Sequence, residues 1–266
     1  MLVDYHTHNY LCKHADGTIE DYIQHAVAIG LHEIGISDHS PMPDHWDGEV
    51  RMNEEQFWNE YKPAVFALQE KYKDNIKVKF GLEGDFFPGT EQWVKEFLSK
   101  NEFDYVLGSV HYLGEWGFDN PIFVHRYEEQ DIDSVYELYY EHIKKSAQCR
   151  LFDIISHCDL VKKFGHRPTK NMEELLRETF KVVKDSNMAV EINTSGLRKP
   201  IKEQYPSEKI LAILSELKIP LTLGSDAHTP EDVGRDFGLA KEFIEKYGNG
   251  RISLFTKRQR SEVKVS

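Results

Sequence analysis

Short apolar runs alternate with longer amphipathic segments along almost the whole chain. The runs are rich in β-branched and aromatic residues and predict strands at residues 2–8, 33–39, 78–83, 105–111, 152–157, 189–193 and 221–228. Between them, apolar residues recur every three to four positions, which predicts helices at residues 18–30, 54–72, 91–98, 134–149, 172–186, 207–217 and 233–247. A short apolar run at 251–255 and a basic tail follow. This alternation predicts parallel strands joined by crossover helices.

Most of the predicted strands end on a histidine, an aspartate or a glutamate. In a closed (β/α) barrel, the C-terminal ends of all strands converge on one active site. A doubly wound open sheet would gather only the strands beside its switch point. We therefore expect a seven-unit α/β barrel, and no linker or low-complexity segment divides residues 1–266 into more than one domain. The loop-like insertion at 114–130 is expected beside the C-terminal end of the strand at 105–111.

Composition and charge limit the kinds of partner that the protein is expected to bind. The chain of 266 residues is 40% hydrophobic and 29% charged, and its formal net charge of -12 argues against wide contact with nucleic-acid backbone. No apolar run approaches the roughly 18 residues of a membrane span, and an export signal is not apparent, so a cytoplasmic protein without membrane contact is expected. The three cysteines include no C-x-x-C pair and suggest neither a disulfide framework nor a thiolate zinc site.

Two histidines of the first predicted strand are candidate metal ligands. His6 and His8 are two positions apart, so on a strand their side chains lie on the same face, about 6.7 Å apart, and can bind one metal ion. Together with the other strand-end groups and one loop histidine, nine potential ligands result, namely His6, His8, His14, His39, Glu83, His111, His157, Asp226 and His228. One zinc takes about four ligands, so two to three metals are implied. Nitrogen and oxygen ligands without thiolate suit Zn, Fe or Mn.

These residues and the short motifs around them resemble the PHP (polymerase and histidinol phosphatase) superfamily over nearly the whole chain. The segments 12–15, 38–41, 157–164 and 191–198 are most similar to its stand-alone histidinol-phosphate phosphatases. The resemblance implies a distorted (β/α)7 TIM-like barrel with a trinuclear centre. It assigns His6, His8, Glu83 and Asp226 to one metal, His14, His39 and His228 to a second, and Glu83, His111 and His157 to a third.

The resemblance also implies hydrolysis of a small phosphate ester, L-histidinol phosphate, late in histidine biosynthesis. Phosphate monoesters hydrolyse very slowly unaided, so we expect direct attack by metal-bound hydroxide without a phosphoenzyme. Asp226 or Asp38 is the expected proton donor to the leaving oxygen, although a role in orienting a ligand histidine is slightly favoured for Asp38.

Further groups are expected to contact the substrate. Arg198, Lys163 and Arg167 follow strand ends and would meet phosphate oxygens, with solvated surface charge as the alternative. The substrate carries an amine and an imidazole, so an acidic rim is expected, with Glu115 and Asp119 as candidates.

Two other functions compete with this one. A nuclease or nucleotide phosphoesterase of the same superfamily is disfavoured by the acidic charge and the lack of a basic groove. A non-catalytic, metal-stabilised module would have lost ligands, whereas all nine positions are present. The sequence leaves a monomer and a homodimer equally open.

Overall fold

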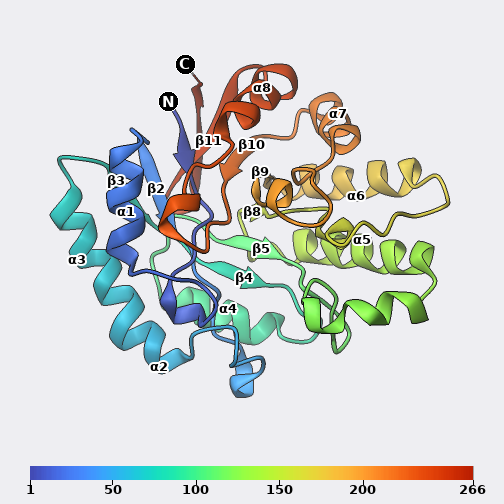
Figure 1. The fold of residues 1–266 in the computed structure, drawn as a ribbon, viewed down its shortest axis with the longest axis horizontal. Helices are drawn as coiled ribbons and strands as arrows, with labels where there is room; N and C mark the ends of the chain where they lie inside the picture. Colours follow the sequence, from blue (N-terminus) through green and yellow to red (C-terminus); the bar gives the residue numbers. More distant parts are fainter. Residues whose placement is uncertain (266) are drawn as a thin grey trace.

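The strands form a closed ring at the centre of the molecule (Figure 1). The computed structural model describes residues 1–265, without the side chain of His45. One parallel sheet has the order β1 (Val3–Asp4), β2 (Glu33–Ile36) and β3 (Lys77–Phe80). The second parallel sheet has the order β10 (Leu221–Gly224), β9 (Ala189–Asn193), β8 (Ile154–Ile155), β5 (Leu107–Ser109) and β4 (Glu83–Asp85).

Backbone contacts close the two sheets into one barrel. Thr7, just after β1, forms a parallel bridge with Ala227, just after β10, and the Tyr5 amide donates to the Leu223 carbonyl over 3.0 Å. At the other seam, His39 bridges Glu83. Because β3 and β4 follow each other without an intervening helix, they occupy one position of the ring. Seven strand positions result within residues 1–265, as the sequence predicts.

Helices cover the outside of the ring (Figure 1). They are α1 (Ile19–Ala28), α2 (Glu54–Gln56), α3 (Lys62–Tyr72), α4 (Glu91–Ser99), α5 (Ile132–Cys149), α6 (Glu173–Asp185), α7 (Glu208–Leu217) and α8 (Phe237–Tyr247). A π-helical segment at Phe57–Tyr61 joins α2 to α3 into one long element, in agreement with the predicted helix at 54–72. A capping box of Thr18 and Asp21 begins α1. None of the helices within residues 1–265 is long and apolar enough to cross a membrane.

The last predicted helix begins later than expected. The sequence predicts a start at Val233, but Gly234 and Asp236 have φ angles of 67° and 62°, which interrupt right-handed helical backbone, so α8 starts at Phe237. The basic segment at the end of the chain was expected as a tail but contains a strand. Residues Gln259–Lys264 form β12, which pairs with β11 (Arg251–Thr256) in an antiparallel hairpin.

This hairpin packs across the N-terminal end of the barrel. The buried Tyr105 ring stacks on Tyr5, with ring centroids 4.7 Å apart, and Phe255 of β11 meets Tyr5 edge-on at 6.2 Å. Tyr105 lies so close to Gly35 and Gly81 that a Cβ atom on either would come within 2.6 Å of its ring or hydroxyl. Only glycine fits at these two positions, and the N-terminal end of the barrel is therefore a packed aromatic core.

The insertion lies at the opposite end of the barrel. It comprises the strands β6 (Tyr112–Leu113) and β7 (Trp116–Gly117) and the 3-10 helical segment Pro121–Glu129. Several of its residues line the main cavity, which confirms the expected position beside the C-terminal end of β5.

Candidate metal centre

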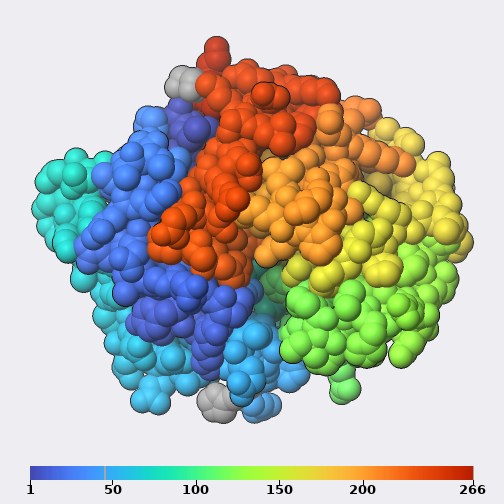
Figure 2. Space-filling model, viewed as in Figure 1, coloured from blue at the N-terminus to red at the C-terminus, as the bar shows by residue number. Residues whose placement is uncertain are grey.

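A cavity of about 650 Å³ lies at the C-terminal ends of the strands. Figure 2 shows the face on which it opens, as a hollow between the blue N-terminal loop, the orange segment near residue 200 and the green insertion. Eight of the nine predicted ligands line the cavity, namely His8, His14, His39, Glu83, His111, His157, Asp226 and His228. The ninth, His6, is completely buried beneath them. The barrel thus brings all nine groups to one place.

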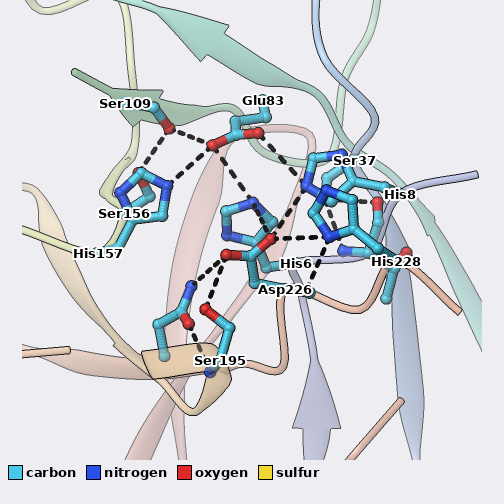
Figure 3. Close-up of polar contacts among 12 residues, drawn as sticks. His6, His8, Ser37, Glu83, Ser109, Ser156, His157, Ser195, Asp226 and His228 are labelled. Atoms are coloured by element: carbon cyan, nitrogen blue, oxygen red, sulfur yellow. Dashed lines mark hydrogen bonds and ion pairs between the residues drawn. The ribbon is translucent and has the colours of Figure 1, made fainter. Parts of the chain in front are cut away.

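Glu83 lies at the centre of these histidines (Figure 3). The imidazole nitrogens nearest to its Oε1 are those of His157 at 3.1 Å, His6 at 3.3 Å and His111 at 3.5 Å, and those nearest to Oε2 are those of His39 at 2.9 Å and His8 at 3.5 Å. Burial alone would raise the pKa of Glu83, but the surrounding imidazoles hold it well below its usual range. An ionised carboxylate shared by this many imidazoles has the geometry of a bridging metal ligand.

Asp226 provides the second carboxylate of the centre. Its Oδ1 lies 3.2 Å from His8 Nε2 and 3.5 Å from His228 Nδ1. Its Oδ2 accepts a hydrogen bond from the Ser195 hydroxyl over 3.0 Å (Figure 3). The φ angle of Asp226 is 51°, in the left-handed region that costs free energy for a residue other than glycine. Such strain is characteristic of functional sites.

Several nitrogens and oxygens of the centre are placed so that a bound cation would pair with them. Nε2 of His14 lies 3.0 Å from Nε2 of His228, while Nδ1 of each faces a backbone carbonyl oxygen. When both Nδ1 atoms carry the proton, two lone pairs face each other. The buried His6 Nε2, His39 Nδ1 and Glu83 Oε2 have no hydrogen-bond partner among the described residues. Buried polar atoms are costly when unpaired, so this donor set fits divalent metal ions.

Three close groups of ligand atoms overlap in part with the sets that the resemblance implies, with His8 in place of His14 in one group and His6 in place of His111 in another. Ligand atoms of His6, His8 and Asp226 lie within 4.8 Å of one another, as do those of His8, His39 and His228, and those of His6, Glu83 and His157. Burial lowers the pKa of His39 to about 4, despite the nearby Glu83 carboxylate, so this imidazole is neutral at pH 7 and able to bind a metal.

A layer of carboxylates behind the histidines orients them. Nδ1 of His6 lies 2.8 Å from Glu191 Oε1, and Nδ1 of His111 lies 2.5 Å from Asp85 Oδ1. Asp38, an expected proton donor, is fully buried with Oδ1 3.3 Å from His8 Nδ1 and does not line the cavity. Each carboxylate fixes which ring nitrogen carries the proton and leaves the other nitrogen for the metal.

Glu191 and Asp85 were not predicted as site residues. One signal was available for Glu191, because a charged residue inside the apolar run 189–193 needs a buried partner. Gly224 on the adjacent strand makes room for it, since a Cβ atom there would lie 1.9 Å from Glu191 Oε1. The carboxylate position therefore depends on a glycine on the neighbouring strand.

The predicted substrate contacts lie in different environments. Lys163 lines the cavity, with its ammonium 3.0 Å from Asp119 Oδ2, and Asp119 lines it too. Arg198 donates to the Ser225 carbonyl oxygen over 2.7 Å and does not line the cavity. Arg167 pairs with Glu203 at 2.6 Å, also outside the cavity lining, and Glu115 is exposed on the insertion. Lys163 and Asp119 are thus placed to meet a ligand in the cavity.

Other cavity residues were not predicted. Arg51 is buried, lines the cavity and pairs with Asp85 at 2.8 Å, and Tyr112, Ser195 and Lys199 complete the polar wall. These residues come from loops and short elements whose position depends on tertiary structure, so no local sequence pattern marks them.

Comparison with known proteins agrees with this geometry. The PHP domain model matches residues 4–195. The chain is 43% identical to a protein of Deinococcus radiodurans named probable histidinol-phosphatase, over 97% of this chain and 98% of the relative. It is 26% identical to the histidinol-phosphatase of Bacillus subtilis, over 91% of this chain and 98% of the relative.

A solved structure shares the fold. The crystal structure of histidinol phosphate phosphatase from Lactococcus lactis, complexed with zinc, L-histidinol and phosphate, matches with a TM-score of 0.81 at 24% sequence identity and covers 98% of both chains. With the family model matching most of the chain and the expected ligands gathered in one cavity, this chain belongs to the PHP domain family.

Proposed function

We propose that this protein is a metal-dependent phosphomonoesterase that hydrolyses L-histidinol phosphate to L-histidinol and phosphate, a step of histidine biosynthesis. The observation that carries the proposal is the Glu83-centred cluster of histidines at the base of an open cavity. The match over nearly the full length of the relatives named histidinol-phosphatase supports the substrate.

Two to three divalent ions, Zn, Fe or Mn, would be held by the residues described above. His6, His8, Glu83 and Asp226 form the first ligand set, His14, His39 and His228 the second, and Glu83, His111 and His157 the third. When bound, such ions stabilise the charge of phosphoryl oxygens and lower the pKa of water. Glu83 keeps the sets at fixed spacing, because both of its oxygens face imidazoles.

Asp226 is the carboxylate that we propose to move protons during hydrolysis. Of the two predicted candidates it alone lines the cavity, whereas Asp38 lies behind His8. Burial would raise the pKa of Asp226, but His6 and the neighbouring imidazoles hold it well below its usual range, so the carboxylate is ionised at neutral pH. It can accept a proton from the attacking water and return it to the leaving oxygen.

Asp119 and Lys163 are proposed to bind the rest of the substrate. The amine and imidazole of histidinol phosphate can both be cationic, and Asp119 is a carboxylate of the insertion that faces the cavity. Its salt bridge to Lys163 would exchange for one to the substrate amine, which frees Lys163 to approach the phosphoryl group. Glu115 is exposed and not in the cavity lining, so Asp119 takes the recognition role in this proposal.

Steady-state phosphate release tests the function. L-histidinol phosphate is compared with p-nitrophenyl phosphate and with the p-nitrophenyl ester of thymidine monophosphate, and metal content is measured on the same sample. We expect the largest kcat/KM for histidinol phosphate, with two to three metals per chain. A preference for the diester would favour a nuclease, and inactivity at full metal loading would favour a non-catalytic module.

Substituting Asp119 tests the recognition role. Asp119→Asn is expected to raise KM for histidinol phosphate by about tenfold, since a charge-assisted hydrogen bond is lost, and to change KM for p-nitrophenyl phosphate much less. Glu115→Gln is the matched control. Equal effects of Asp119→Asn on both substrates would refute the role.

A further inference from the structure

The two lysines that line the cavity have different environments. The Lys163 ammonium is bound to Asp119 at 3.0 Å, and the one cavity-lining arginine described, Arg51, is bound to Asp85 and Asp47 at 2.8 and 3.0 Å. Lys199 also lines the cavity and is only partly exposed. Its ammonium has neither a salt bridge nor a hydrogen bond to any residue in the part of the chain that the structure describes.

The backbone fixes where Lys199 lies. It directly follows the short helical segment Ser195–Arg198, and its amide donates to the Gly196 carbonyl oxygen over 3.1 Å. Ser195 begins that segment, and its hydroxyl donates a hydrogen bond to Asp226 in the metal centre. One rigid turn therefore contacts the ligand carboxylate at one end and carries Lys199 on the cavity wall at the other.

The charges around Lys199 favour an anionic ligand. Burial lowers the pKa of Lys199, Asp226 raises it, and the nearby Lys163 and Arg198 lower it further. An ammonium that is partly removed from water and close to two other cations is stabilised when an anion binds beside it. The two nearby carboxylates pair with other groups and not with Lys199, because Asp226 faces histidines and Asp119 is bound to Lys163.

We propose that Lys199 is a phosphoryl-binding cation of this cavity. Its ammonium would donate to a phosphoryl oxygen that points away from the metal centre. Asp119 would bind the opposite, cationic part of the substrate, and Lys163, released from its salt bridge with Asp119, would be a second cation near the phosphoryl group. The inference rests on the proposed phosphatase function and assigns one of its substrate contacts to a residue that the sequence analysis did not select.

Inorganic phosphate and L-histidinol separate the two halves of the substrate. Metal-loaded full-length protein is titrated calorimetrically with each ligand, and each is also used as an inhibitor of p-nitrophenyl phosphate hydrolysis. Lys199→Met is expected to weaken phosphate binding by about tenfold to a hundredfold, the usual effect of losing a charged hydrogen bond. L-histidinol binding and metal content should stay at wild-type values, because L-histidinol carries no phosphate.

Two variants serve as controls. Lys199→Arg keeps the positive charge and should recover most of the phosphate affinity. Lys181→Met removes an exposed lysine on the outer face of α6 and should have no effect.

Several results would overturn the inference. One is an unchanged phosphate affinity in Lys199→Met. Equal weakening of phosphate and L-histidinol binding, or loss of metal, would also overturn it, since both indicate a structural role. Failure of the wild-type protein to bind phosphate would overturn it as well. Binding of phosphate through Lys199 without hydrolysis of histidinol phosphate would refute the proposed substrate but support this contact.

Discussion

The two ends of the barrel are built on the same strands but differ in their side chains: one is a packed aromatic core and the other holds the candidate metal ligands. At the N-terminal end, Tyr105 donates its hydroxyl hydrogen to the Tyr5 carbonyl oxygen over 2.7 Å, and Tyr5 donates to Glu33 over 2.5 Å, beneath a hairpin that covers them. At the C-terminal end, buried nitrogens and oxygens of His6, His39 and Glu83 lie close together but make no hydrogen bond within the described part of the chain. The first end is held by aromatic packing and hydrogen bonds of the protein itself, whereas the donor set of the second fits bound ions.

This difference separates stability from activity within a single ring. Aromatic packing and satisfied hydrogen bonds stabilise the fold at the end away from the substrate. The C-terminal end holds buried polar atoms without a hydrogen bond among the described residues and a left-handed aspartate, and both cost free energy. Changes at the two ends should therefore affect different measurements.

Removal of metal should have the largest effect on turnover. Chelation is expected to abolish activity and to lower Tm, because an ion present at a hundred times its Kd stabilises the folded state by about 2.7 kcal/mol. Hydrogen exchange should speed up in residues 6–8 and 226–228 and stay slow in the β11–β12 hairpin. Uniform loss of protection would show that the two ends are not independent. Restored activity on adding metal back is the control.

Glu83→Gln should come next in effect. The variant keeps the shape of the side chain but loses the charge that several imidazoles share, so at least one metal should be lost, together with nearly all activity. Metal content and kcat are the measurements, with Glu115→Gln on the exposed insertion as the matched control. Full metal occupancy in Glu83→Gln would contradict the bridging role.

Changes behind the ligands should be milder. Glu191→Gln weakens the partner of His6, and Gly224→Ala places a methyl group where the Glu191 carboxylate lies. Each is expected to reduce metal affinity by about tenfold to a hundredfold. Excess metal in the assay should restore most of the activity, which distinguishes these variants from Glu83→Gln. No change in metal affinity would argue against an orienting role.

At the other end, Phe255→Ala should leave turnover almost unchanged while lowering stability. Phe255 is buried against Tyr5, and removal of such a ring costs about 3–5 kcal/mol. Denaturant unfolding and kcat at a temperature well below Tm measure both effects on one sample. A large loss of kcat in the folded variant would break the separation between the ends.

The smallest effect is expected on the outer helices, at neither end. Glu20 of α1 contacts Lys71 and Tyr72 of α3 at 2.6 Å, and these hydrogen bonds lower its pKa to about 2. Its stabilising effect is present above its usual pKa and is lost as the pH falls from about 4.5 to 2. Glu20→Gln should lower Tm slightly at pH 7 and not at pH 2. A difference that persists at pH 2 would exclude this pair as its cause.

The sequence was sufficient to predict the ring and the gathering of the nine candidate ligands, because polar strand ends are visible in the pattern. His39, Glu83 and His111 each end an apolar run, and a barrel necessarily brings strand ends together. The length of the helix at 54–72 followed from its periodicity in the same way. These features depend on local pattern plus one global rule.

Other features depend on tertiary contacts that leave little local trace. Of the residues of β12 only Val263 is apolar, so no apolar pattern marks the strand, and its pairing with β11 explains it. The start of α8 depends on two left-handed residues. Whether Arg198 or Lys199 faces the cavity depends on the direction of one short turn, which residue type alone does not determine.

The long sequence separation between ligands has a consequence for the timing of folding. His14 and His228 lie 214 positions apart, and the Thr7 and Ala227 bridge closes only when the last ring strand has joined. During synthesis the nascent chain exposes His6, His8 and His14 long before Asp226 emerges from the ribosome. Metal bound by these three histidines alone would stabilise the unfolded chain and reduce the stabilisation of the folded one, so metal loading stabilises the fold most after the chain is complete.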